Sequence, residues 1–412
     1  MHSTTPDNPA LRVLVATWGT AGDIAPYTGI AVALKAAGHR VTVVTSNRYA
    51  KSFTDHGIAV RAIHINHFEE RARQAKPWRE RVHNGQAIST EAGSVMLGTA
   101  AEGQDILLTH PLLHPMAAVI AEALRLPCIG IYTVSHAMMV PRLMAALPWR
   151  RHSVADLTVR LLMSPMYAPA LSCLRRTLGM RMRQMQDLVG ALRNQPVRYG
   201  ISDALLPPSF TLPAGQSTTG HWPPARPPGW PPGWSPDQCL QDFLDSGPAP
   251  VYFGFGSMEE VNGEHLVRTI VHSAKKLKVR AVVQAGWAGI HAETDDVLTI
   301  AQCPHEWLFP RMRAAVHHAG PGTTHASLAA ATPTLPVPVG RDQPFWASRL
   351  TTLGLAPTSL PIRQVTTAHL THALRQTLLD ERYGHNTRRM QGRLRQQDGL
   401  SRLVQDIPTL AR

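Results

Sequence analysis

The segment that most constrains the fold is a short apolar run followed at once by a Gly/Pro turn and a small-residue helix. Ala314 to Val316 is typical of a buried strand, the next eight residues read His-His-Ala-Gly-Pro-Gly-Thr-Thr, and a helix is predicted from Ala326 to Ala331. The first N–H groups of such a helix lack intrahelical partners, so they can bind an anion. The same pattern also occurs in ordinary strand–helix connections.

A second polar cluster favours the anion-binding interpretation. Asp342 and Gln343 follow the next predicted strand, Leu335 to Val339. Adjacent parallel strands would bring both clusters to one sheet edge, which is where α/β folds bind ligands.

The ordered run from Pro304-His305 to Gln343-Pro344-Phe345-Trp346 resembles the donor-binding signature of the UDP-glycosyltransferase superfamily. It is most similar to the bacterial and fungal branch that holds sterol glucosyltransferases and the glycosyltransferases of antibiotics and glycolipids. The resemblance implies the GT-B fold, an α/β architecture in which two doubly wound Rossmann-like domains face each other across a cleft.

The resemblance also implies a donor site. A diphosphate would be bound by one group of residues at strand and helix ends: Ser257, His318, Gly320, Gly322, Thr323 and Thr324. Asp342 and Gln343 match the pair that hydrogen-bonds sugar hydroxyls, for which a carboxylate and an amide are suited. The nucleobase and ribose would lie near Gln302, Cys303 and His305. His317 is expected to face inward as a core histidine, because alternate strand residues point to opposite faces.

The catalytic base is expected in the first domain. Leu11 to Thr17 is predicted as a strand, and Gly-Thr-Ala-Gly-Asp follows it, ending at Asp23. By resemblance this aspartate faces the acceptor, and it would accept the hydroxyl proton best if desolvation raised its pKa. A role in stabilising its own loop is the alternative. Gly22 and His110 are predicted to line the acceptor pocket.

Three departures from the family pattern leave the nucleobase and the sugar open. Residues 319–322 read Ala-Gly-Pro-Gly where relatives often have Gly-Gly-Ala-Gly, and Ala21 stands where relatives have Arg. Gln302 occupies the place where plant relatives stack a tryptophan on uracil.

Alternating strand and helix patterns predict four successive parts of the chain. Residues 1–206 would form the acceptor-binding domain, in which 67–100 is expected to be a loop or short helices and about 138–193 a Met-rich helical insert. The Pro-rich segment 207–236 is predicted to be a linker, and 237–389 the nucleotide-sugar-binding domain. The resemblance implies that residues 390–412 form a helix that packs back on the first domain.

Composition restricts the partners. The net charge of +13 fits anionic ligands, but no nucleic-acid-binding motif is present, so no nucleic acid partner is expected. Four scattered cysteines, no secretory signal and no membrane-spanning apolar run predict a cytoplasmic protein. Arginines around the insert would allow weak peripheral contact with an anionic membrane, or simply form a solvated face: Arg150, Arg151, Arg160, Arg175, Arg176, Arg181 and Arg183.

The sequence therefore predicts an inverting hexosyltransferase that needs no metal or cofactor, since D-x-D and H-E-x-x-H motifs are absent. The donor would be a UDP-sugar, UDP-glucose first, or a dTDP-sugar, and the acceptor an apolar sterol, polyketide or lipid alcohol. An epimerase or hydrolase on the same fold and a catalytically silent partner-binding helper are the alternatives. The oligomeric state stays open.

Overall fold

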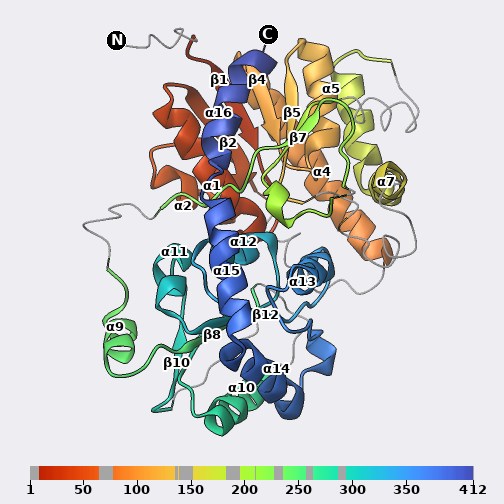
Figure 1. The fold of residues 1–412 in the computed structure, drawn as a ribbon. Helices are drawn as coiled ribbons and strands as arrows, with labels where there is room; N and C mark the ends of the chain where they lie inside the picture. The colour runs from red at the N-terminus through yellow and green to blue at the C-terminus, as the bar shows by residue number, and fades with distance from the viewer. Residues whose placement is uncertain are drawn as a thin grey trace, which may run out of the picture.

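The computed structural model describes residues 9–64, 78–134, 138, 152–181, 195–208, 210–226, 235–256, 263–285 and 294–411. These residues form two α/β domains, one above the other in Figure 1, each built on a parallel sheet. The GT-B arrangement expected from the sequence is thereby confirmed.

The first domain contains a seven-stranded sheet in the order β3-β2-β1-β4-β5-β6-β7. Its strands are β1 Arg12–Ala16, β2 Arg40–Ser46, β3 Ala59–Ile63, β4 Ile106–Thr109, β5 Cys128–Tyr132, β6 Val197–Tyr199 and β7 Gln216–Thr218. All neighbouring strands pair in parallel, so their carboxyl ends share one edge. The helices are α1 Ala21–Ala36, α2 Lys51–Thr54, α4 Trp78–Ala101, α5 His114–Leu124 and α7 His152–Thr177.

The second domain has a five-stranded parallel sheet in the order β10-β9-β8-β11-β12. Its strands are β8 Val251–Gly254, β9 Ala281–Gln284, β10 Val297–Ile300, β11 Ala314–His317 and β12 Thr334–Pro336. The helices are α9 Gln238–Asp245, α10 Gly263–Leu277, α11 His305–Leu308, α12 Pro321–Ala329, α13 Gln343–Thr352 and α14 Thr367–Leu379. Two further helices, α15 Glu381–Leu394 and α16 Gly399–Leu410, end the described chain.

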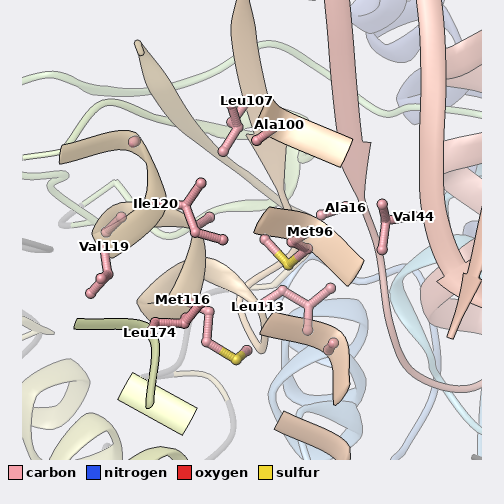
Figure 2. Close-up of a cluster of buried hydrophobic side chains, with 14 of the residues drawn as sticks. Ala16, Val44, Met96, Ala100, Leu107, Leu113, Met116, Val119, Ile120 and Leu174 are labelled. Atoms are coloured by element: carbon pink, nitrogen blue, oxygen red, sulfur yellow. The ribbon is translucent and has the colours of Figure 1, made fainter. Parts of the chain in front are cut away.

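One prediction for the first domain is wrong. The region expected to be a loop or short helices contains α4, a helix of 24 residues. It covers one face of the sheet together with α5 and α7, and Met96 and Ala100 of α4 meet Met116 of α5 in the same apolar cluster (Figure 2). Apolar positions four residues apart, at 88, 92 and 96, supply the stripe that holds the helix there.

Two domain boundaries also require correction. Strand β7 lies inside the segment predicted as a linker, so the first domain continues past residue 206. The single C-terminal helix predicted from residue 390 is two helices, because Asp398 begins a new one by accepting a hydrogen bond from Ser401 N–H. Met390 of α15 belongs to a cluster with Leu328 and Trp346 of the second domain.

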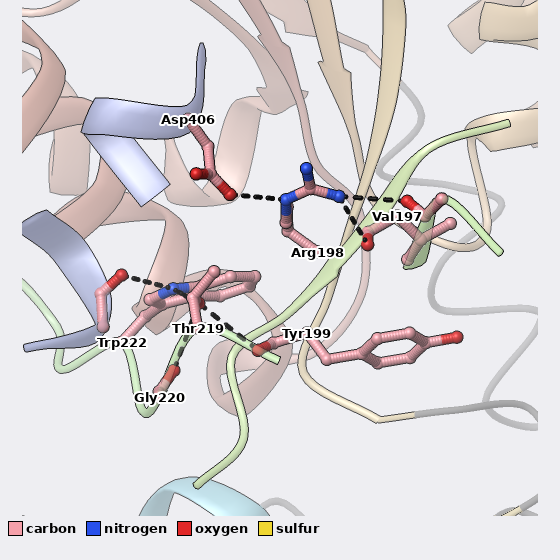
Figure 3. A network of polar contacts seen from close by, with 9 residues as sticks. Val197, Arg198, Tyr199, Thr219, Gly220, Trp222 and Asp406 are labelled. Atoms are coloured by element: carbon pink, nitrogen blue, oxygen red, sulfur yellow. Dashed lines mark hydrogen bonds and ion pairs between the residues drawn. The ribbon is translucent and has the colours of Figure 1, made fainter. Parts of the chain in front are cut away.

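Helix α16, by contrast, lies on the first domain. Leu403 and Ile407 are buried against α1 and the first sheet. Arg198 of β6 donates to Asp406 at 2.6 Å, and the buried Trp222 indole donates to Gly399 O at 3.2 Å (Figure 3). The predicted linker therefore packs tightly where it is described.

No helix in the described parts of the chain combines the length and the apolar character that crossing a membrane requires.

Candidate functional site

The two domains are joined by a shared apolar cluster. Tyr132 and Leu205 of the first domain are buried with Phe345 and Trp346 of the second. Arg349 of α13 also donates to the carbonyls of Leu205 and Leu206, at 2.8 and 3.2 Å. These contacts fix α12 and α13 against the first domain.

His317, at the end of β11, is the core histidine expected from the sequence. It is completely buried, its Nδ1 accepts from Ala319 N–H at 3.0 Å, and its Nε2 lies 2.5 Å from the Thr334 hydroxyl on β12. Burial lowers its pKa far below the usual range, so the ring is neutral. Its role is to hold the turn between β11 and α12.

The environment of His318 differs from that of His317. Its ring lies between two glycines: a methyl group added at Gly320 would lie 2.5 Å from His318 Nε2, and one at Gly256 would lie 3.0 Å from Cε1. The Nδ1 atom is buried and forms no hydrogen bond with a residue that the structure describes. Burial lowers the pKa of the ring to about 4, although the backbone of Gly254 acts in the opposite direction. A neutral imidazole with an unsatisfied nitrogen beside a helix start is suited to bind an oxyanion.

The start of α12 lies next to this ring. Gly320 is its N-cap without a side-chain cap, Pro321 is in the first turn, and Gly322 and Thr323 are partly exposed. The Thr324 hydroxyl is buried and has no hydrogen-bond partner within the described ranges of the chain. Backbone N–H groups and a hydroxyl thus meet where the helix dipole favours negative charge.

His325, one turn further along α12, anchors this helix to the first domain. Its Nδ1 donates to Pro321 O at 2.8 Å, and its Nε2 accepts from Ser202 N–H at 3.4 Å. The ring also stacks on His221, with centroids 4.4 Å apart and planes 8° from parallel. Burial lowers the pKa of His325 to about 4, so the contact is between neutral rings.

The second predicted cluster lies beside the first, because β11 and β12 are neighbours in the sheet. Asp342 is the N-cap residue of α13, but its side chain does not cap the helix and instead accepts from the Trp346 indole at 2.9 Å. Burial raises the pKa of Asp342 to about 6, and the negative charge of Asp23 adds to the shift. Gln343 is buried, and its Oε1 accepts from the N–H groups of Val339 and Gly340, at 2.8 and 3.1 Å.

The electrostatic effect of Asp23 on Asp342 places the first domain's predicted base near the second domain's predicted sugar site. Asp23 lies in the first turn of α1, and its Oδ2 accepts from Thr20 N–H at 2.7 Å and from the Thr20 hydroxyl at 2.8 Å. The loop-stabilising role is therefore real. Among the described residues no hydrogen bond reaches Oδ1, so one oxygen of this carboxylate can still accept a proton.

The two residues predicted for the acceptor pocket lie near this loop. Gly22 is exposed in the first turn of α1. His110 follows β4, the neighbour of β1, and its N–H donates to Ala16 O at 2.8 Å. Its ring is buried, accepts from Leu112 N–H at 3.2 Å, and lies 5.6 Å from the Tyr27 ring.

The residues predicted for the nucleobase region follow β10. Gln302 is exposed, and burial raises the pKa of the Cys303 thiol to about 11, which makes it unreactive. His305 stacks on Phe309, with centroids 4.3 Å apart, and its Nε2 lies 3.4 Å from the Tyr252 hydroxyl. The pKa of His305 is lowered to about 4 by burial and by His318, so the two rings are close.

Two family models match the chain. Residues 13–90 match the glycosyltransferase family 28 N-terminal domain, and residues 278–407 match the erythromycin biosynthesis protein CIII-like C-terminal domain. Both halves of the fold thus carry glycosyltransferase sequence patterns. The chain belongs to the UDP-glycosyltransferase superfamily.

Among members of this superfamily, the chain is 27% identical to a sterol 3-beta-glucosyltransferase from Debaryomyces hansenii, over 95% of this chain and 26% of that protein. It is 25% identical to one from Arabidopsis thaliana, over 96% of this chain and 65% of that protein. The chain therefore spans only part of these relatives, about a quarter of the yeast protein.

Solved structures confirm the GT-B fold. The glycotransferase of kitacinnamycin aligns with a TM-score of 0.71 and 18% identity, over 97% of this chain and 99% of that chain. The glycosyltransferase VinC, determined in complex with dTDP, aligns with a TM-score of 0.70 and 18% identity, over 97% and 99%.

One predicted site residue could not be placed, and two residues beside the predicted site were missed. Ser257 lies outside the described residues. Tyr252, which donates to Gln284, and His325 were missed, because their partners are distant in the chain. The available signal for His325 was its position just after the predicted Gly-Thr-Thr start of the helix, which places its ring near that helix start.

Proposed function

We propose that this chain transfers a hexose from a nucleotide diphosphate sugar to a hydroxyl of an apolar acceptor, with inversion at the anomeric carbon. The observation that carries the proposal is that Asp23 of one domain lies close enough to Asp342 of the other to raise its pKa. In this proposal Asp23 is the proton acceptor and Asp342 the sugar-binding carboxylate, and the start of α12 binds the diphosphate beside them. The sterol and antibiotic glycosyltransferases among the relatives support an apolar acceptor.

In the proposed reaction the diphosphate binds His318 and the start of α12, and Asp342 accepts hydrogen bonds from sugar hydroxyls. The acceptor oxygen attacks the anomeric carbon from the face opposite the diphosphate, and its proton passes to Asp23 Oδ1. The bond from the anomeric carbon to the phosphate oxygen breaks, and its electron pair leaves with the diphosphate. N–H groups and a neutral histidine stabilise this charge without reorganising.

The donor can be tested by thermal shift with UDP, dTDP, UDP-glucose and dTDP-sugars. A ligand at 100 times its dissociation constant stabilises the native state by about 2.7 kcal/mol. We expect a shift with one nucleotide series, unaffected by EDTA, and its loss in His318→Ala. His372→Ala, an exposed histidine on α14, is the matched control and should keep the shift.

Transfer itself is tested by mass spectrometry of glycosides after incubation with sterol and polyketide alcohols. If the nucleotide is released from the donor without any acceptor, the protein is a hydrolase and not a transferase. If none of the nucleotides binds, the catalytically silent helper is favoured and the transferase proposal is wrong.

We also propose weak peripheral contact of the helical insert with a membrane, made by its exposed arginines only. Arg175 is buried and bonded to Glu122 and to Arg181 O, so it takes no part. Arg176 and Arg181 are exposed. The side chains of the remaining four arginines lie outside the described residues.

A further inference from the structure

A stronger concentration of positive charge lies near the C-terminus. Residues 361–402 contain eight arginines, no lysine and only three acidic residues, namely Asp380, Glu381 and Asp398. No acidic residue occurs between Glu381 and Asp398, a stretch that includes most of α15. This face was not singled out by the sequence motifs, and the proposed reaction does not use it.

Two of the three acids are already engaged. Asp380 forms an ion pair with Arg382 at 2.6 Å and caps α15. Asp398 caps α16 by accepting from the N–H and the hydroxyl of Ser401, at 3.0 and 2.6 Å. The positive charge further along α15 is therefore left without local neutralisation.

The arginines of α15 point outward. Arg388, Arg389 and Arg393 are exposed, and none of them forms an ion pair with a described residue. The opposite side of the helix is occupied, because Thr387 and Met390 are buried and Gln391 donates to Ala329 O of α12 at 2.7 Å. In Figure 1, α15 runs lengthwise along the front of the molecule. The helix thus presents one solvated cationic side, which we name the α15 arginine face (Arg388, Arg389 and Arg393).

An exposed leucine lies next to the start of this helix. Leu379, the last residue of α14, is 67% exposed, and it is the large hydrophobic residue that stands out in this way among the described residues. The exposed Arg375 lies four residues earlier, on the same side of α14. An exposed leucine beside arginines places an apolar side chain next to cations, and a bilayer can accommodate both, the first in its acyl region and the second at its headgroups.

We propose that the α15 arginine face and Leu379 dock on a bilayer that contains acidic phospholipids. Guanidinium groups bind phosphate oxygens in a planar, bidentate way, and each basic residue near an anionic membrane strengthens binding. The leucine favours a bilayer over a nucleic acid, because it can enter the acyl region while a phosphate backbone offers it no apolar partner. If the proposed function is correct, this docking brings the enzyme to the phase in which an apolar acceptor is dissolved.

The test is co-sedimentation of the full chain with vesicles of phosphatidylcholine alone or with 30% phosphatidylglycerol, about one lipid in three being anionic. We expect binding only to the anionic vesicles, weakened by salt. The triple variant Arg388→Gln, Arg389→Gln, Arg393→Gln should lose about 100-fold in vesicle affinity. Leu379→Ser should lose about fivefold, because one partly inserted apolar side chain is removed.

The matched control removes the same charge elsewhere, with Arg40→Gln, Arg125→Gln and Arg313→Gln, all at exposed positions. It should lose no more than a few-fold in affinity. Equal losses in the two triple variants, or no binding to anionic vesicles, would overturn the proposal. Binding to single- or double-stranded oligonucleotides with none to vesicles would assign the face to nucleic acid instead.

Nucleotide thermal shifts of the same variants separate this proposal from the proposed function. The α15 triple variant should keep the wild-type shift, since these arginines are not part of the donor site. Vesicle binding without any nucleotide shift would support docking and contradict the transferase.

Discussion

The Gly19–Asp23 loop of the first domain and the Arg341–Gln343 loop of the second are both held by a side chain that bonds to the backbone, but they use different residues for this. In each, a side chain accepts hydrogen bonds from backbone N–H groups of its own turn. Asp23 does so in the first loop, through Oδ2. In the second loop Gln343 does it, through Oε1, and the neighbouring Asp342 is held by the Trp346 indole.

In the proposed reaction, one carboxylate would combine the structural and the chemical role in the first domain, while the second domain would divide them between two residues. The division has an electrostatic consequence. Asp342 is partly buried and has a pKa raised to about 6. Asp23 accepts two hydrogen bonds with one oxygen, and its other oxygen bonds to no described residue. In the second loop, we therefore expect one substitution to affect mainly folding stability and another mainly the reaction. In the first loop, substitutions of Asp23 can affect both.

The largest effect is expected for Asp23→Asn. The amide oxygen can still accept from Thr20 N–H, so the loop should fold, but an amide does not take up the acceptor proton. We predict a loss in kcat on the order of 1,000-fold with nucleotide binding retained. Kinetics and thermal shift measure the two, and Asp55→Asn, a surface carboxylate paired with Lys51, is the control. Activity within tenfold of wild type would leave Asp23 with the loop-stabilising role alone.

Asp342→Asn should change stability in a pH-dependent way. Because the native state raises the pKa of this carboxyl from 3.8 to about 6, it binds the proton more tightly than the unfolded chain does. The ionised carboxylate therefore destabilises the fold above pH 6, and the cost disappears as pH falls below the unfolded pKa. Removing the charge should stabilise the protein at pH 7.5 by about 3 kcal/mol.

Urea denaturation from pH 4 to pH 8 checks the Asp342 prediction. The gain should shrink between pH 6 and pH 4, while donor-sugar affinity falls at every pH because the carboxylate acceptor is lost. Asp295→Asn, at an exposed turn, should show neither change. A difference in stability that stays constant over this range would contradict the raised pKa.

The sequence predicted well those features that follow from local patterns. The donor loops of the second domain follow short buried strands, so their residues were placed at one sheet edge from local patterns, and β11 and β12 are neighbours as expected. Helix α4 was missed because Gly, Ser and Thr interrupt it, although its apolar residues recur every four positions. Strands β6 and β7 have three residues each, too few for a periodic pattern.

The remaining features depend on contacts between distant segments. His325 became an anchor only through Ser202 and His221, and Asp23 gained its relation to Asp342 from the packing of two domains. No local pattern encodes such pairs, since they arise from tertiary packing. The role of Gln343 in its own turn is likewise visible only once the β12–α13 loop is folded.

The smallest effect, and the one that tests the division of roles most directly, is expected for Gln343. Gln343→Leu removes the acceptor of two N–H groups, those of Val339 and Gly340, which are both partly exposed. Water can replace part of the lost bonding, so we predict a loss of about 1 kcal/mol in unfolding free energy. Gln343→Glu keeps an oxygen acceptor at the same place, so its unfolding free energy should stay within a few tenths of a kcal/mol of the wild-type value. If Gln343 only holds its turn, the glutamate variant should also retain donor affinity, measured by calorimetry. A glutamate variant that folds normally but loses donor-sugar binding would instead give Gln343 a direct contact with the sugar, and the two loops would then differ less than their hydrogen bonds indicate.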